Sequence, residues 1–175
     1  MSQIKKVEPH VHTVRTNSII NEVPSNIDDY LDELDENQAL IVTEHGNCLG
    51  WFQKYKSITE KGLKYIHAVE AYICDNGEDK HNFHLLIYAL NNEGRKDINE
   101  LIYKSTHRDG HFYRRPRMYI DEVLNMSDNL AISTACSSGV LSDTKSVEFQ
   151  KLMKWGLKNK DRLFIELQPH TLIKQ

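Results

Sequence analysis

The chain has 175 residues, a formal net charge of −3, 39% apolar residues and 27% charged residues. Its length fits one domain, and its charge excludes a global positive field for nucleic acid or membranes. Three widely spaced cysteines without a C-x-x-C pair indicate a reducing compartment without disulfides. The first residues lack the apolar core of a signal peptide, and no apolar run reaches membrane-spanning length. We therefore expect a cytoplasmic protein without a membrane partner.

The first expected element is an extended segment at 6–13 that carries His10 and His12. Side chains alternate along a strand, so residues two apart point to the same face. Both imidazoles can then reach one point, as two nitrogen ligands of a metal ion must. A polar loop follows at 13–24.

Beyond that loop, short apolar runs alternate with segments of helical periodicity. The strands are expected at 39–42, 65–74, 83–89, 129–133 and 162–167. The helices are expected from the capping box at 25–28 onward and at 48–61, 93–106, 120–126 and 146–158, with an irregular segment at 109–117. Such alternation is typical of βαβ units and predicts an α/β fold with a mostly parallel sheet or barrel.

Several residues able to bind metal lie at or just beyond the carboxyl ends of expected strands, where α/β barrels build their sites. These are His12, His45, Cys136 and His170. Together with residues inside strands, they give the candidate set His10, His12, His45, Glu70, His84 and Cys136. Imidazole, carboxylate and thiolate ligands suit zinc, or manganese and iron where oxygen donors dominate. More than four ligands indicates more than one ion, with Glu70 as the natural bridging group.

Each candidate also has a structural interpretation. His10 and His12 could be an ordinary pair without metal, and His84 could be a core histidine with satisfied hydrogen bonds. Cys136 could be a small buried apolar side chain, the usual state of a free cysteine. A basic cluster of Arg114, Arg115 and Arg117 stands among aromatic residues. It could contact a phosphate backbone or stack on bases, or it could be a solvated loop that pairs with acidic helices.

Several sequence blocks resemble one known family. They are PHVHT, IVTEHGNCLGWFQKYK, AVEAYIC, HLLIYALNNEGRKDINELI, FYRRPRMYIDEVL, AISTACSSGVL and FIELQPH. In this order they are similar to the N-terminal polymerase and histidinol phosphatase (PHP) domain of bacterial replicative DNA polymerase III alpha subunits. The resemblance runs from about Ile4 to His170.

The resemblance implies a distorted (β/α)7 barrel that holds up to three zinc or manganese ions. His10, His12 and Glu70 would hold one ion, and Glu70 would bridge to a second ion held by His84 and Cys136. His45 would serve the third. Family members with all ligands are linked to 3′–5′ exonuclease or phosphoesterase activity, and members that lost ligands have a structural role beside the polymerase and its proofreading partner.

The sequence departs from the family pattern at several positions. Asn21 or Glu22 stands where the family has an acidic ligand, and Glu44 replaces an aspartate. The family's last Asp-x-His pair, the final barrel strands and all polymerase regions lie beyond the chain. We therefore expect a single PHP domain at 1–175 with an incomplete barrel, marginal alone or completed by another chain, as from a split polymerase gene of a phage.

Three functions follow from this sequence. The first is a metal-dependent phosphoesterase that trims a DNA 3′ end. The second is a structural module of a replicative polymerase with a weakened site, with DNA, the remaining polymerase fragment and a proofreading subunit as partners. The third is a free-standing metal-dependent phosphoesterase. For the isolated chain, the absent ligands favour the second function.

Overall fold

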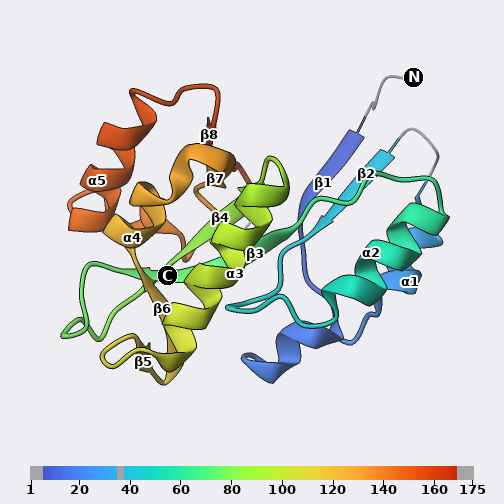
Figure 1. The fold of residues 1–175 in the computed structure, drawn as a ribbon, viewed down its shortest axis with the longest axis horizontal. Helices are drawn as coiled ribbons and strands as arrows, with labels where there is room; N and C mark the ends of the chain where they lie inside the picture. Colours follow the sequence, from blue (N-terminus) through green and yellow to red (C-terminus); the bar gives the residue numbers. More distant parts are fainter. Residues whose placement is uncertain (1–5, 35–37, 169–175) are drawn as a thin grey trace, which may run out of the picture.

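The computed structural model describes residues 6–34 and 38–168, whose strands form two sheets (Figure 1). β1 (Lys6–Val11) and β2 (Gln38–Val42) are a parallel pair. The second sheet has the order β5 (Phe112–Tyr113), β6 (Arg115–Tyr119), β3 (Ala68–Cys74), β4 (Phe83–Ala89), β7 (Leu130–Ser133) and β8 (Leu163–Phe164). His170, a candidate at the end of the last expected strand, lies outside the described residues.

The backbone just after β2 joins the two sheets. Gly46 N donates to Glu70 O at 2.8 Å, and Glu70 N donates to Glu44 O at 3.0 Å. β2 therefore continues beside the middle of β3 through an isolated parallel bridge. Within the described part of the chain the strands do not close into a barrel.

The expected α/β class with parallel-rich sheets is confirmed, although some strand pairs are antiparallel. β3 and β6 are parallel, as are β7 and β8, whereas β4 runs antiparallel to both β3 and β7. The connection at 75–82 between β3 and β4 contains no helix and is shorter than the dozen residues that a parallel crossover requires. The two strands therefore form a hairpin.

Helices cover the outer faces of both sheets. α1 (Ile27–Leu31) and α2 (Trp51–Glu60) lie beside β1 and β2 at the right of Figure 1. Leu31, Leu40, Val42 and Ile58 join these helices to β2 in one buried cluster. The larger sheet is covered by α3 (Asn92–His107), α4 (Ile120–Asn125) and α5 (Val147–Gly156). Short 3-10 helices occur at Val14–Ser18, Ser127–Asn129 and Val140–Ser142.

Strand alternation separates a helix-facing core from an inner face. The main core contains the odd-numbered residues of β3 and β4, namely Val69, Ala71, Ile73, Phe83, Leu85 and Ile87. The even-numbered residues Ala68, Leu86 and Tyr88 pack instead with Ile41 of β2. Since successive side chains point to opposite faces, Glu70 and His84 must also lie on this inner face. A polar cluster is thus placed between the two sheets.

The segment at 109–117, expected to be irregular, contains β5 and the start of β6. Arg117 is only 1% exposed in β6, and its guanidinium donates to the carbonyl oxygens of Gly77, Gly110 and His111. This pairing compensates for burying a charge in a strand. Among the described helices, none is long and apolar enough to cross a membrane.

Candidate metal centre

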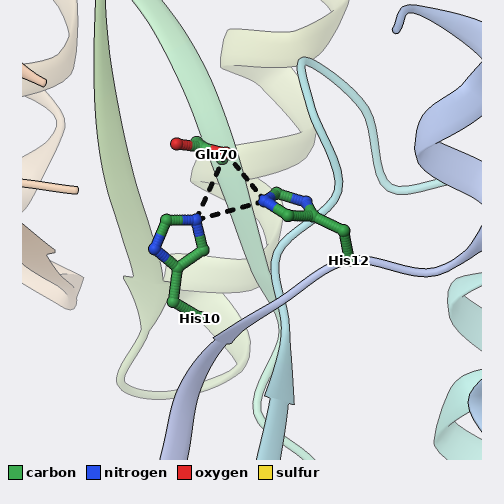
Figure 2. A group of neighbouring side chains, drawn as sticks. All are labelled: His10, His12 and Glu70. Carbon is green, nitrogen blue, oxygen red and sulfur yellow. Dashed lines mark hydrogen bonds and ion pairs between the residues drawn. The ribbon is translucent and has the colours of Figure 1, made fainter. Parts of the chain in front are cut away.

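Glu70 is surrounded by four histidines, two of which, His10 and His12, are drawn with it in Figure 2. Its Oε2 atom is 3.3 Å from His10 Nε2, 3.0 Å from His12 Nε2 and 3.1 Å from His45 Nδ1. Its Oε1 atom is 2.9 Å from His84 Nδ1. Four histidines from three separate segments of the chain therefore converge on one carboxylate that is 1% exposed.

The H-x-H pair reaches the carboxylate from β1 and the residue that follows it. As Figure 2 shows, the rings of His10 and His12 point from one side toward Glu70, and their Nε2 atoms are 3.1 Å apart. The backbone is held there by Tyr88, whose hydroxyl donates to Pro9 O at 3.0 Å. The same-face geometry expected from the sequence is therefore present.

His45 is placed by the bridge that joins β2 to β3. It pairs with Glu70 in a parallel bridge and is followed by Gly46, whose φ is +62°. A Cβ atom at Gly46 would lie 2.8 Å from Cγ of Pro116. Both the left-handed backbone and the close approach favour glycine at this turn.

Cys136 is brought to the cluster by a loop that pairs with β4. His84 N donates to Ser138 O at 3.0 Å, so the loop runs beside His84. Cys136 Sγ is 3.4 Å from His84 Nδ1 and 3.7 Å from Glu70 Oε1. Ala135, just before it, has a φ of +58°, a strained conformation for a residue with a side chain.

Glu22 extends the cluster on the side of His45. Its Oε1 atom is 3.0 Å from His45 Nε2, and its side chain is 39% exposed. Of the two exposed residues that the sequence left open, Asn21 and Glu22, the one in contact with His45 is Glu22. The potential ligand atoms fall into three overlapping groups: His10, His12 and Glu70; His12, Glu22 and His45; and His45, Glu70 and His84.

The site is a cleft of about 340 Å³ lined almost wholly by these groups. Burial would raise the pKa of Glu70, but the imidazole groups of His10, His12 and His84 beside its carboxylate outweigh it and hold the pKa well below its usual range. Burial would likewise lower the pKa of His10 and of His84, yet Glu70 and their other partners raise each to about 9. Burial dominates at His45 and lowers its pKa to about 4.

Some of these buried atoms lack hydrogen bonds despite their close neighbours. Glu70 Oε2, His45 Nδ1 and His12 Nδ1 have no hydrogen-bond partner among the described residues. A buried polar atom without a partner costs free energy, so such atoms are rare in folded proteins. An anionic oxygen among ring nitrogens provides the donor set of a divalent cation. The residues present therefore fit a metal.

Two residues considered as site candidates have other roles. Glu44 is fully buried and accepts hydrogen bonds from Thr13 N at 3.0 Å and from Lys54 Nζ at 3.1 Å. Its carboxylate is already satisfied, which is a correction to its possible role as a ligand. Arg117 is the second correction, because its buried guanidinium binds backbone carbonyls and cannot reach a nucleic acid. Arg114 is exposed and Arg115 is half-buried.

Sequence reasoning missed Glu166, which stands two residues beyond β8. Its Oε1 atom is 2.8 Å from His10 Nδ1, and Gln168 beside it also lines the cleft. A signal was present, since Glu166 lies near the carboxyl end of the strand expected at 162–167, as His12, His45 and Cys136 lie at the ends of theirs. Apart from this position, the only signal was that Glu166 is a charged residue within an otherwise apolar run.

A mixed α/β fold with histidines gathered round a buried glutamate defines a candidate metal-binding α/β protein. A family model described as "PHP domain" matches residues 9–170. The chain therefore belongs to the PHP domain family, as its sequence blocks indicated.

Several relatives of this chain are described as DNA polymerase III subunit alpha. The chain is 30% identical to DNA polymerase III subunit alpha of Aquifex aeolicus over 79% of its own length, and 30% identical to that of Helicobacter pylori over 71%. The Thermus aquaticus subunit is 29% identical over 80% of this chain. The matched region spans only 13%, 10% and 12% of these three proteins.

A solved structure shares the fold. It is described as a metal-dependent phosphoesterase from Bifidobacterium adolescentis, with a TM-score of 0.52 at 10% identity. The match covers 95% of this chain and 77% of that one. At such low identity the likeness concerns the fold alone.

Proposed function

We propose that this PHP domain binds a cluster of divalent metal ions and hydrolyses phosphodiester bonds at a DNA 3′ end. The observation that carries the proposal is Glu70 Oε2, which lies within 3.3 Å of three ring nitrogens and has no hydrogen-bond partner among the described residues. A bound cation would satisfy these lone pairs together. The polymerase relatives supply the reason for choosing DNA as the substrate.

The ligand groups suggest how the ions would be shared. One ion would be held by His10, His12 and Glu70, a second by Glu70, His84 and Cys136, and a third by His45, His12 and Glu22. The thiolate favours zinc at the second position, and the exposed carboxylate of Glu22 suits manganese at the third. When bound, such ions supply Lewis acidity to a phosphoryl oxygen.

Arg115 is the residue of the basic cluster that we propose for phosphate contact. Its guanidinium lies 4.9 Å from the ring centroid of Tyr72, and Tyr72 stacks 5.6 Å from His45. A phosphodiester at the metal centre would thus have a cation nearby to orient it. Arg114, which is exposed and lies 5.5 Å from the Tyr113 ring, is proposed for the flanking backbone.

A second candidate function is a structural module of a replicative polymerase in the cytoplasm. It is favoured by the relatives, in which the matched region is 13% or less of the protein. In this proposal residues 1–175 are part of one PHP domain of the distorted (β/α)7 type. The rest of a polymerase and a proofreading subunit would be its partners, and metal would stabilise the domain without turnover.

The decisive experiment combines metal content with hydrolysis. Protein stripped by chelator is reloaded with zinc or manganese, and bound metal is counted after dialysis. Hydrolysis is then measured on single-stranded DNA labelled at its 3′ end and on a phosphate monoester. Glu70→Gln, which keeps the shape but removes the charge, is compared with Glu93→Gln in an exposed ion pair with Lys96.

The DNA phosphoesterase proposal expects at least one tightly held ion per chain and release of 3′ nucleotides, with both lost in Glu70→Gln and unchanged in Glu93→Gln. Metal binding without any hydrolysis would favour the structural module. Hydrolysis of the monoester alone would favour a free-standing phosphoesterase for small molecules. No metal binding in the wild type would refute the metal centre.

A further inference from the structure

The two ring nitrogens of His10 have different neighbours. Nε2 faces the metal centre, 3.3 Å from Glu70 Oε2 and 3.1 Å from His12 Nε2. Nδ1, on the other side of the ring, is 2.8 Å from Glu166 Oε1. A carboxylate accepts hydrogen bonds but cannot donate them, so the proton of this contact lies on Nδ1.

Glu166 is itself held in place by the strands beside it. Its backbone N donates to Thr134 Oγ1 at 3.0 Å, and its Oε1 atom also accepts from Gln168 Nε2 at 2.6 Å. Its side chain is 12% exposed. The carboxylate therefore has little freedom to leave His10, and the contact joins the end of β8 to β1 across 156 residues of sequence.

We propose that Glu166 is a positioning residue that fixes His10 in the Nδ1–H tautomer and aims the Nε2 lone pair at the metal centre. This inference rests on the proposed metal site. A carboxylate behind a metal-binding histidine sets the ring orientation and raises the basicity of the ligating nitrogen, and its loss typically costs 10- to 100-fold in metal affinity.

The geometry argues against two simpler roles. Glu166 contacts the nitrogen that faces away from Glu70, and it belongs to none of the described groups of converging ligand atoms. It is therefore not a direct ligand. A purely structural role is also disfavoured, because its buried Oε2 atom has no hydrogen-bond partner among the described residues, and a neutral side chain would avoid that cost.

The test compares two glutamate–histidine pairs of equal length. Glu166→Gln removes the charge behind His10, and Glu122→Gln removes it from a pair in which Glu122 Oε2 is 2.8 Å from His111 Nε2. Glu122 and His111 do not line the metal cleft. Zinc affinity is measured by competition with a chromophoric chelator, and the stability of each metal-free protein is measured by urea unfolding.

Glu166→Gln is expected to weaken zinc binding about 10- to 100-fold, and Glu122→Gln to leave it within about twofold, even if both lower stability. A two-bond imidazole ¹H–¹⁵N spectrum of the zinc-loaded wild type is expected to show His10 with its proton on Nδ1. If Glu166→Gln does not fold, this spectrum and Thr134→Val, which removes the hydroxyl that anchors Glu166, still test the inference. Thr134→Val is expected to weaken binding by about threefold or more.

Zinc affinity of Glu166→Gln within about twofold of the wild type would overturn the positioning role, as would a His10 proton on Nε2. Those results would leave the metal centre itself intact. A wild type that binds no zinc would instead overturn the proposed function and this inference with it. The two failures are therefore distinguishable.

Discussion

Glu44 and Glu70 are two buried glutamates that lie side by side but differ in their surroundings. Their backbones are hydrogen-bonded, since Glu70 N donates to Glu44 O, and their side chains are 0% and 1% exposed. The carboxylate of Glu44 accepts hydrogen bonds from Lys54 and from both the N–H and the hydroxyl of Thr13. Glu70 is surrounded by histidines, and one of its oxygens has no hydrogen-bond partner in the described structure. Both carboxylates are buried charges, but only that of Glu70 has an oxygen without a hydrogen-bond partner among the described residues, and this indicates a metal ligand.

The largest expected change in stability comes from Glu44, the glutamate whose carboxylate is fully hydrogen-bonded. Glu44→Ala should lower the free energy of unfolding by about 3–5 kcal/mol, because it leaves the buried ammonium of Lys54 without its counter-charge. Urea unfolding in the presence of chelator measures this. The control is Glu60→Ala in the exposed pair with Lys56, which should change stability by less than about 1 kcal/mol. Equal effects of the two substitutions would remove the distinction between a structural and an ordinary surface carboxylate.

Part of the arrangement round Glu70 could be predicted from the sequence, because the alternation of side chains along a strand is a local property. His10 and His12 share a face by their spacing, whereas the hairpin of β3 and β4 that brings Glu70 and His84 together was not expected from the sequence. The convergence of these residues is a consequence of register. Tyr72 of β3 pairs with His84 of β4, which places His84 diagonally across from Glu70.

The hydrogen bonds that satisfy Glu44 could not be predicted, because they depend on contacts between elements that are distant in sequence. Nothing in the run around Glu44 reveals that Lys54 turns inward from α2. The same holds for Arg117, whose guanidinium donates to four backbone carbonyl oxygens from two loops that precede β6 in sequence, those of Gly77, Asp79, Gly110 and His111. Glu166 was missed for a similar reason, since its partner His10 belongs to the other sheet.

His67 extends the comparison to a buried histidine with complete hydrogen bonds. Its Nδ1 accepts from the Tyr65 hydroxyl at 2.9 Å, and its Nε2 contacts Asn99 Oδ1 at 3.2 Å. Burial lowers its pKa from 6.5 to about 4 despite the hydrogen bond to Asn99. The folded state thus binds fewer protons than the unfolded state between these values, so the stability that His67 contributes is complete above pH 6.5 and is lost as the pH falls toward 4.

The comparison of wild type with His67→Gln isolates this effect from the titration of other histidines. In chelator, the stability advantage of the wild type should shrink by up to about 3 kcal/mol between pH 7 and pH 4. Urea unfolding at several pH values measures the difference. A stability difference that stays constant with pH would mean that His67 binds the same number of protons in the folded and unfolded states. The contrast between His67 and the histidines of the metal centre would then not hold.

The smallest expected effect is a change in metal affinity on substitution of Cys136, which lies beside Glu70 and His84. Cys136→Ser replaces a soft sulfur ligand beside Glu70 and His84 by a hydroxyl, so zinc affinity should fall about tenfold while manganese affinity changes by less than about threefold. Competition titrations with each metal measure this, and Cys48→Ser, whose thiol donates to Ala68 O, is the matched control. An equal loss for both metals would show that the substitution disturbs the loop rather than a ligand. No loss for either would restrict the donor set round Glu70 to imidazole and carboxylate, because the half-buried thiol of Cys136 would then contribute no ligand atom.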